Sequence, residues 1–381
     1  MSRPLRIGVD ARELLGDTTG VGRYLGELMR RWAAREDAGR RRFILYAPEA
    51  LQLVFPAGTT DERVVGRGTG TWWEQTSLRR AVNADALDAF FAPAYTAPVG
   101  IDVPLAVTIH DVSFIAHPEW FRPRERFRRR WLTRRAASRA SVVFTDSEFS
   151  RGELEARLSV EPGRIRVVPP GVARLVGTPS SREPRVATRE PLVLYVGSLF
   201  NRRRLPDLIA AFAQASSDLP DARLVIVGAD RTWPPQNLDA AAAAHGVASR
   251  VDLRSYVSET ELADLYARAS VFGFLSEYEG FGMTPLEALA AGVPVVVLDT
   301  PVAREVYGPA AEYVRPGDIP GTAAALRRYL TSPLPAEHLA HAPSVLARYS
   351  WDRAAAETVE HIERIAGNRN AARRAARRAA L

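Results

Sequence analysis

The sequence predicts an α/β protein of two domains, and three observations favour this fold class. The chain has 381 residues, which is too many for one hydrophobic core and typical of two domains. Short apolar strands alternate with helical stretches in both halves of the chain. Residues 173–190 are rich in Pro, Ser, Thr and Arg and have no periodicity, so we expect them to be a linker between residues 1–172 and 191–349.

The expected elements follow the alternation along each half. In the first half we expect strands at residues 6–10, 43–46, 89–92, 106–110, 142–145 and 165–168, and helices at 22–35 and 124–140. In the second half we expect strands at 192–197, 223–228, 251–253, 271–275 and 295–299, and helices at 205–214, 237–245, 259–269 and 285–291. A last helix at about 352–365 precedes a basic segment, residues 367–381, that we expect to be a flexible tail.

Composition excludes several classes of protein. The chain is 46% hydrophobic and 25% charged, as in ordinary soluble proteins. No apolar run approaches the ~20 residues that cross a bilayer, and the N-terminus has no signal-peptide pattern. The sequence contains no cysteine, which excludes disulfides and agrees with the cytoplasm. The six histidines show no metal-ligand spacing, so we expect no metal site.

Charge is unevenly distributed, and all 51 basic residues are arginine. Residues 1–172 carry 27 arginines against 21 acidic residues, whereas residues 191–366 carry 15 against 21. This asymmetry predicts that the first domain meets an anionic surface. Residues 122–139 hold nine arginines interleaved with Phe127 and Trp131, a pattern that suits anionic lipid. The alternative, which we favour at this point, is a surface helix whose aromatic side chains pack inward.

The most informative segment is residues 276–299, where Glu279 and Glu287 lie eight positions apart around a glycine-bearing loop. Thr284 suits a helix N-cap and Pro285 the first helical position, which places Glu287 at the third. Loop amides and a helix N-terminus form an anion site, and carboxylates accept hydrogen bonds from hydroxyl groups. The alternative is that Thr284 and Glu287 form only a capping box. The spacing alone leaves both interpretations open.

The segment from Glu279 to Val296 resembles the donor-binding signature of retaining GT4-type glycosyltransferases, the glycosyl transferases group 1. In that family the first glutamate contacts the donor sugar and the second takes the ribose hydroxyls. The resemblance gives these roles to Glu279 and Glu287. The amides between them hold the sugar and the diphosphate, and here these belong to Gly280, Phe281, Gly282, Met283 and Thr284.

A second segment, from Gly197 to Leu205, also resembles the family. Relatives place a lysine against the donor diphosphate, preceded by arginine. Arg203 occupies the lysine position and Arg202 the arginine before it. Arginine can neutralise a diphosphate with two hydrogen bonds, although its geometry differs from that of an ammonium group. The alternative, a solvated arginine run at a helix start, is unfavourable beside the helix dipole.

Two segments of the first half match the family at positions that face the ligand. Gly20 and Gly22 lie in the expected glycine loop after the first strand, which would face the acceptor and the donor phosphate. His110 and Asp111 end a strand, and in similar enzymes the histidine reaches the donor sugar. Without that context, the glycines could form an ordinary turn and the His-Asp pair could be structural. The expected catalytic residues are thus His110, Asp111 and Glu279.

The resemblance covers about residues 5–365 and implies a GT-B fold, with two Rossmann-like domains facing each other across a cleft. The helix at 350–366 would return to the N-terminal domain. It implies a retaining, metal-independent hexosyltransferase without a cofactor, active in polysaccharide biosynthesis. The donor would be GDP-mannose or another nucleotide diphosphate sugar, and the acceptor a hydroxyl of a glycan or lipid-linked molecule.

The expected location is the cytoplasm, with a peripheral contact to the anionic inner face of the plasma membrane as an option. Two alternatives remain. The GT-B fold also carries other nucleotide-sugar enzymes, such as epimerases. A basic nucleic-acid-binding protein would explain the pI of about 10.0. That class leaves Glu279 and Glu287 unexplained, so we expect no nucleic-acid partner.

Overall fold

The computed structural model describes residues 3–16, 20–35, 37–53, 55–56, 58–172, 189–332 and 336–379. The chain divides into two compact units. The first unit comprises Met1–Ala116, Arg124–Gly171 and Ser350–Leu381, and the second His117–Pro123 and Val172–Tyr349. Residues 117–123, which the sequence places in the first domain, thus belong to the second unit. The expected linker falls mostly on residues 173–188, which lie outside the described residues.

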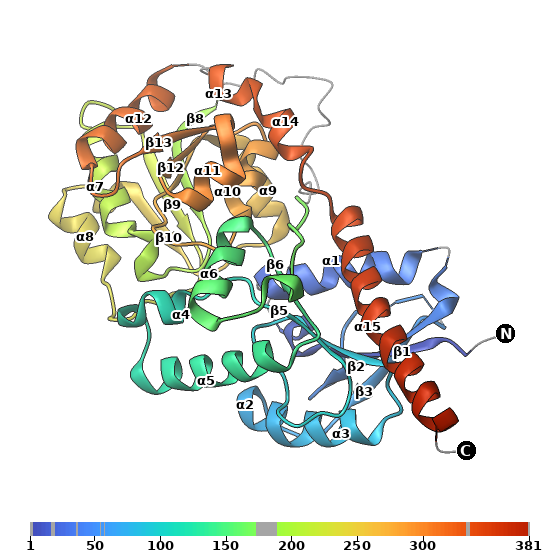
Figure 1. The fold of residues 1–381 in the computed structure, drawn as a ribbon. Coiled ribbons are helices and arrows are strands. Elements are labelled where there is room, and N and C mark those ends of the chain that lie inside the picture. The colour runs from blue at the N-terminus through green and yellow to red at the C-terminus, as the bar shows by residue number, and fades with distance from the viewer. Residues whose placement is uncertain are drawn as a thin grey trace. The chain divides into compact units, whose positions relative to one another are not determined.

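The first unit is built on a parallel sheet of seven strands among the described residues (Figure 1). Its order is β3-β2-β1-β4-β5-β6-β7. The strands are β1 Leu5–Asp10, β2 Arg41–Ala47, β3 Thr60–Val64, β4 Ala89–Ala92, β5 Leu105–Thr108, β6 Val142–Thr145 and β7 Ile165–Val167.

The central strands are almost entirely apolar because both faces of the sheet are covered. Every residue of β4, β5 and β6 is buried, as expected for a parallel sheet covered on both sides. Trp32 from the first helix stacks on Phe43 of β2, with ring centroids 5.2 Å apart. The edge strand β3 was not predicted, because its sequence Thr-Asp-Glu-Arg-Val is mostly polar and three of its residues are exposed.

The helices of the first unit are α1 Gly20–Ala34, α2 Gly70–Trp73, α3 Arg79–Ala84, α4 Ser113–Ala116, α5 Pro123–Arg139, α6 Glu148–Leu158 and α15 Trp351–Ala379. A π-helical turn, Glu74–Leu78, joins α2 to α3. The C-terminal helix α15 packs against α1, where Trp32 Nε1 donates to the Ala355 carbonyl at 2.8 Å. Helix α15 runs on to Ala379, so residues 367–379, expected as a separate tail, continue the same helix.

The second unit contains a parallel sheet of six strands among the described residues, with helices on both faces (Figure 1). Its order is β10-β9-β8-β11-β12-β13. The strands are β8 Glu190–Val196, β9 Arg223–Val227, β10 Val251–Arg254, β11 Ala269–Phe274, β12 Val295–Leu298 and β13 Ala311–Val314. The helices are α7 Leu205–Ala215, α8 Leu238–Ala244, α9 Glu259–Arg268, α10 Met283–Ala290, α11 Pro301–Tyr307, α12 Ile319–Thr331, α13 Ala336–Ala340 and α14 Ala342–Leu346.

Arg189 fixes the amino edge of the second sheet. Its guanidinium donates to the carbonyls of Tyr266, Ala269, Ala291 and Gly292 at 2.6–3.1 Å. The residue after it opens β8. Residues 189 and 190, which the sequence places in the linker, are therefore integral to the second unit.

In the part of the chain that the structure describes, no helix is both long enough and apolar enough to cross a membrane.

Candidate functional site

The two predicted ligand-binding segments of the second unit follow adjacent strands of its sheet. Strand β8 leads into a 3-10 turn, Asn201–Arg203, and β11 leads into the loop that carries Glu279. Because β8 and β11 are neighbours and parallel, both segments leave the same carboxyl edge, where open α/β sheets bind ligands. The Glu277 amide donates to the Arg202 carbonyl at 2.9 Å and ties the segments together.

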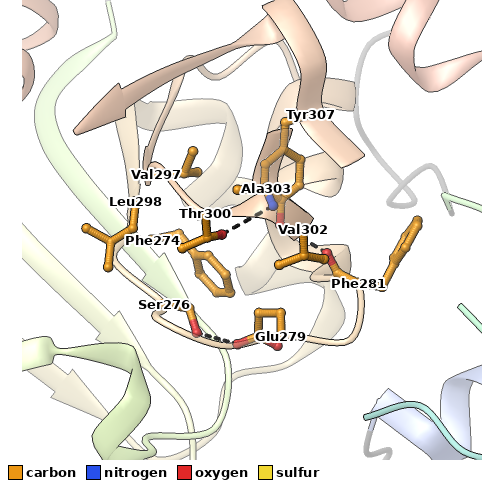
Figure 2. A pocket seen from close by; sticks show the side chains of 10 residues that line it. All are labelled: Phe274, Ser276, Glu279, Phe281, Val297, Leu298, Thr300, Val302, Ala303 and Tyr307. Atoms are coloured by element: carbon orange, nitrogen blue, oxygen red, sulfur yellow. Dashed lines mark hydrogen bonds between the residues drawn. The ribbon is translucent and has the colours of Figure 1, made fainter. Parts of the chain in front are cut away.

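Glu279 and Arg203 form an ion pair at this edge. Arg203 Nη1 lies 2.8 Å from Glu279 Oε1, and Arg202 Nε lies 3.6 Å from the same oxygen. Ser276 Oγ also donates to Oε1, and Figure 2 shows this bond. Only 8% of the Glu279 surface is exposed. The structure therefore brings together the carboxylate and the two cations that the sequence assigns to one ligand.

The Arg203 guanidinium is held in a largely apolar place. Its side chain is 12% exposed, and its central carbon lies 4.5 Å from the centre of the Phe274 ring. Buried Nε has no hydrogen-bond partner among the described residues. A cation in such surroundings interacts more strongly with an anion than it would in water. A diphosphate oxygen could accept a hydrogen bond from this guanidinium, whereas the Phe274 ring offers no such acceptor.

Helix α10 begins earlier than the sequence predicts. It starts at Met283, with Gly282 as the N-cap and no side-chain capping bond. The prediction that Thr284 is the N-cap and Pro285 the first helical residue is therefore wrong. Gly282 has a φ of +88°, which an L side chain rarely adopts. This conformation turns the chain from the loop into the helix, so the glycine, rather than Thr284, sets the helix start.

Glu287 is a buried residue in the middle of α10 rather than part of a capping box. Its exposed fraction is 3%. The Tyr266 hydroxyl donates to Glu287 Oε2 and to the Thr284 carbonyl, each at 3.5 Å. The capping interpretation of Glu287 is wrong, because the helix starts one residue before Thr284 and lacks a side-chain cap.

Tyr307, at the end of α11, fixes the loop between Glu279 and α10. Its hydroxyl donates to the Gly282 carbonyl at 2.9 Å and to the Phe281 carbonyl at 3.4 Å. A Cβ on Gly282 would lie 2.2 Å from this hydroxyl oxygen. The Tyr307 hydroxyl thus occupies the space that a side chain at position 282 would need. Its hydrogen bond to the Gly282 carbonyl holds the loop in one arrangement.

A small pocket opens beside these groups (Figure 2). It is lined by Phe274, Ser276, Glu279, Phe281, Val297, Leu298, Thr300, Val302, Ala303 and Tyr307. Its cavity volume is only about 10 Å³, which is room for about one water molecule. Sites for small-molecule ligands are usually about 300–1,000 Å³, so a hexose or a nucleotide would have to lie outside this pocket.

In the first unit, both ring nitrogens of His110 are engaged. Nδ1 lies 2.7 Å from Asp146 Oδ2, and Nε2 lies 3.1 Å from the Pro93 carbonyl. Both neighbours are hydrogen-bond acceptors when Asp146 is ionised, which favours the doubly protonated imidazolium. Burial acts to lower the pKa of His110, but the Asp146 carboxylate, together with the Pro93 carbonyl and Asp111, outweighs burial, so the pKa is raised above its ordinary value.

Asp111 supports the start of α4. Its Oδ1 accepts from the Ser113 amide at 2.8 Å, and its Oδ2 accepts from the Tyr95 hydroxyl at 3.2 Å. Gly20 is the first residue of α1, and Gly22, two residues further on, is buried. Thr18 and Thr19, the start of the expected glycine loop, lie outside the described residues. Asp111 thus makes structural contacts, and the structure describes only the helical part of that loop.

A buried charge cluster at the end of β1 was missed by the sequence analysis. Arg12 Nη2 lies 2.8 Å from Asp10 Oδ2 and also pairs with Glu74. Thr96 Oγ1 donates to Glu74 Oε2 at 2.6 Å. Burial raises the pKa of Asp10 to about 6, although Arg12 opposes this. Glu74 lies on the π-helical turn, far along the chain from Asp10, so no local pattern could reveal the cluster.

Ser276 and Tyr307 were also missed as site residues. Ser276 lies inside the recognised segment, and its position three residues before Glu279 was the available signal. Tyr307 is remote in sequence and carries no such signal. Among the described residues, no group of three or more His, Cys, Asp or Glu side chains could hold a metal ion.

Comparisons with known proteins match both halves of the chain. The family model of Glycosyltransferase Family 4 matches residues 18–174, and that of Glycosyl transferases group 1 matches residues 178–342. Both families agree with the resemblance found in the sequence.

Three curated relatives that match about two thirds of this chain are 26–28% identical to it. An MMP α-(1→4)-mannosyltransferase of Mycolicibacterium hassiacum is 28% identical over 278 residues, 68% of this chain and 65% of the relative. An O-antigen chain mannosyltransferase B of Escherichia coli is 26% identical over 266 residues, 66% of this chain and 68% of the relative. A glycogen synthase of Mycobacterium tuberculosis is 28% identical over 276 residues, 70% of this chain and 65% of the relative. The chain therefore spans less than two thirds of the length of the Mycolicibacterium and Mycobacterium relatives, 65% in each case.

Solved structures share the fold. WaaG, a glycosyltransferase involved in lipopolysaccharide biosynthesis, superposes with a TM-score of 0.72 at 19% identity, covering 94% of this chain and 99% of that one. Anabaena HepE in complex with UDP-glucose gives a TM-score of 0.69 at 18% identity, with the same coverage. The predicted GT-B class, with its two Rossmann-like parallel-sheet domains, is confirmed.

Proposed function

We propose that this chain, which belongs to the glycosyltransferases with family 4 and group 1 domains, transfers a hexose from a nucleotide diphosphate sugar to an acceptor hydroxyl. The observation that carries the proposal is the arrangement at the carboxyl edge of the second sheet. There, Arg203 and Glu279 form an ion pair beside the loop that leads into α10, and α10 carries Glu287. Arg203, Glu279 and Glu287 would match three parts of the donor: the diphosphate, the hexose and the ribose.

Arg203 and Arg202 would neutralise the diphosphate. In hexose transfer the bond from the sugar to the diphosphate breaks, and negative charge grows on the leaving group. Guanidinium groups already in place stabilise that charge without reorganisation. Arg203 now pairs with Glu279, so the diphosphate would compete with this carboxylate for the cation. Positive charge from two arginines is the reason that we propose transfer without a metal ion or cofactor.

Glu279 would accept hydrogen bonds from hydroxyls of the hexose. Ser276 holds one of its oxygens, and release from Arg203 would leave the carboxylate facing the small pocket. The amides from Gly280 to Thr284 would hold the sugar and the diphosphate near the positive end of α10. Tyr307 keeps that loop in place through its bond to Gly282.

Glu287 would accept the ribose hydroxyls of the donor. A buried carboxylate is a strong hydrogen-bond acceptor, and the loss of a hydroxyl partner in such a place is costly. In the first unit, we assign His110 to the donor sugar and Gly20 and Gly22 to the phosphate and acceptor side. The role of Asp111 would then be to hold α4 next to His110, through its bond to Ser113.

The donor that we propose first is GDP-mannose, because relatives of this chain include mannosyltransferases. The acceptor would be a glycan or lipid-linked hydroxyl, as in polysaccharide biosynthesis. We propose retention of the anomeric configuration, which the resemblance to retaining enzymes supports. The lack of cysteine agrees with a reducing compartment, and we propose the cytoplasm.

A screen of donors tests the proposed function. Purified protein would be incubated with GDP-, UDP- and dTDP-linked mannose and glucose, and release of the nucleoside diphosphate would be followed. One nucleotide sugar should be turned over slowly even with water as acceptor, and the freed sugar should first appear with the anomeric configuration of the donor. Release of no nucleoside diphosphate from any donor, with or without glycan acceptors, would contradict the proposal. Conversion to another intact nucleotide sugar would instead indicate an epimerase.

A further inference from the structure

The outer face of α5 combines exposed aromatic rings with unpaired positive charge. Leu132, Thr133, Ala136 and Ala137 form the buried side of this helix. At 100° per residue, Phe127 and Trp131 lie on the opposite side. In Figure 1 the helix lies along the outside of the first unit.

Phe127 and Trp131 are large apolar side chains that stay exposed, and Trp131 has the Arg135 guanidinium 5.6 Å from its ring centre. Phe127 is 72% exposed and Trp131 is 46% exposed. The interpretation that we favoured from the sequence, in which these aromatics pack inward, is therefore wrong. These two exposed rings lie one turn apart and form an apolar patch on the outer face of the helix.

Arginines flank this patch on both sides. By the same geometry, Arg124 and Arg128 lie to one side of the rings and Arg130 to the other, and all three are exposed. Among the described residues, none of these three has an ion pair or a hydrogen bond. The helix contains one acidic residue, Glu125, which pairs with Arg129 at 2.8 Å. The outer face therefore carries net positive charge that the protein itself does not neutralise.

We propose that the outer face of α5, defined by Arg124, Phe127, Arg128, Arg130 and Trp131, docks on an anionic lipid bilayer. A bilayer interface has a place for both the aromatic rings and the arginines of this face. Aromatic rings favour the boundary between headgroups and acyl chains, and guanidinium groups bind lipid phosphates just outside it. The net charge of the first half, 27 arginines against 21 acidic residues, adds attraction of the same sign. This proposal does not depend on the identity of the donor.

Vesicle co-sedimentation tests the proposal, with phosphatidylcholine alone compared with an equimolar mixture of phosphatidylcholine and phosphatidylglycerol. Binding should require the anionic lipid. It should disappear between ~0.1 M and ~1 M salt, as the Debye length falls from about 10 Å to about 3 Å. Equal binding to both vesicles, or binding that salt does not weaken, would overturn the proposal.

Charge-reversal variants test whether α5 is the surface that binds the vesicles. The double variant Arg128→Glu, Arg130→Glu should bind anionic vesicles at least ~30-fold more weakly, because each basic residue near such a surface contributes roughly fivefold. The matched control is Arg223→Glu, Arg315→Glu in the second unit, two exposed arginines whose reversal changes the net charge by the same amount. Wild-type binding by the first variant, or an equal loss in the control, would refute the assignment to α5.

The aromatic residues give an independent readout. The variant Phe127→Ala, Trp131→Ala should weaken vesicle binding about tenfold or more through loss of buried apolar surface. The fluorescence of Trp131, taken as the difference between wild type and Trp131→Phe, should become protected from acrylamide when anionic vesicles are added. Melting curves and activity in the donor screen should stay at wild-type values in every variant. Unprotected Trp131 fluorescence with bound vesicles would overturn the docking geometry. Loss of oligonucleotide binding in the Arg128→Glu, Arg130→Glu variant, without vesicle binding by the wild type, would show a nucleic-acid surface instead.

Discussion

Arg203 and Glu279 are the residues on which the proposed chemistry depends most. Each is almost buried, and each neutralises the other across 2.8 Å. A buried carboxylate left without its cation is costly, so the pair would separate only when a ligand supplies both a phosphate for Arg203 and a hydroxyl for Glu279. A nucleotide diphosphate sugar carries both groups. This exchange of partners would make the site selective for donors that contain the hexose as well as the diphosphate.

Arg203 is the first residue to test. The variant Arg203→Ala should lower kcat/KM by about 10²-fold or more, because it removes preorganised charge from the leaving group. Arg203→Lys should keep much of the activity, since similar enzymes have lysine there. Steady-state kinetics with the best donor measures both. Melting curves are needed as a control, because Arg203→Ala also removes a partner of buried Glu279. Full activity of a folded Arg203→Ala enzyme would remove Arg203 from the site.

The two glutamates should have separable effects. Glu287→Gln should mainly raise the KM for the donor, since it weakens ribose binding, whereas Glu279→Gln should mainly lower kcat. Glutamine keeps the side-chain volume, and Glu287 does not cap α10, so a helix-capping loss does not confound the comparison. Tyr266→Phe is a control that keeps the Glu287 carboxylate and removes the hydroxyl that lies 3.5 Å from Glu287 and from the Thr284 carbonyl. Two variants with wild-type kinetics would contradict both assignments.

The ion pair between protonated His110 and Asp146 should make the stability of the protein depend on pH. Its pKa in the folded protein is raised above the ordinary value of 6.5 by Asp146. The stabilisation from this pair is therefore fully present below about pH 6.5 and is lost as the pH rises through the higher folded pKa. Asp146→Asn removes the carboxylate that contributes most to raising the pKa, so the pKa should fall, although the Pro93 carbonyl and Asp111 still act against burial. An NMR titration of the His110 ring in both proteins measures the shift. An unchanged pKa in the variant would show that Asp146 is not its cause.

At the scale of elements, the start of α10 shows what the sequence could and could not predict. The segment from Glu279 to Glu287 was recognised, and its loop and helix are present. The helix start was misplaced because Thr-Pro is a strong local capping signal, whereas the left-handed Gly282 is imposed by packing against Tyr307. That contact joins residues 25 positions apart, and local propensities contain no information about it.

The contact between α11 and this loop gives an element-scale prediction. Gly282→Ala should destabilise the loop by about 1–3 kcal/mol, because alanine is strained at a positive φ and its Cβ would meet the Tyr307 hydroxyl. Donor affinity should fall with it. Tyr307→Phe removes the hydroxyl and its bond to the Gly282 carbonyl but leaves the glycine conformation intact, so its effect should be smaller. Thermal unfolding and donor titration measure both changes. A Gly282→Ala protein as stable as wild type would show that the loop tolerates another conformation.

The central strands were easier to predict than the edges. Strands β4, β5 and β6 are continuous apolar runs, because both faces of the sheet are covered. Strand β3 is polar, and β13 has the pattern Ala-Glu-Tyr-Val, so neither stands out from loop sequence. Both lie at the edge of a sheet, where one neighbour and partial exposure relax the demand for apolar residues. The other two edge strands, β7 and β10, were predicted, so the two missed strands combine an edge position with a sequence that has no clear strand pattern.

At the scale of the whole molecule, the predicted two-domain class follows from chain length and from strand–helix alternation, and solved glycosyltransferases share this fold. The path of the last helix could not be derived from periodicity. Helix α15 returns to the first unit, where it packs against α1 through Trp32 and through the Arg31–Asp352 ion pair. Only the family resemblance predicted that return, because its contacts join residues more than 300 positions apart in the chain.

The central claim is that the carboxyl edge of the second sheet binds the nucleotide diphosphate of the donor. Hydrogen exchange of the wild-type protein, with and without the nucleoside diphosphate that the donor screen selects, tests this claim most directly. Amides of residues 198–205 and 279–290 should exchange more slowly in its presence, because they lie in the loops and in the helix that hold it. Exchange that is unchanged in both segments at a saturating concentration of the nucleoside diphosphate would contradict the account.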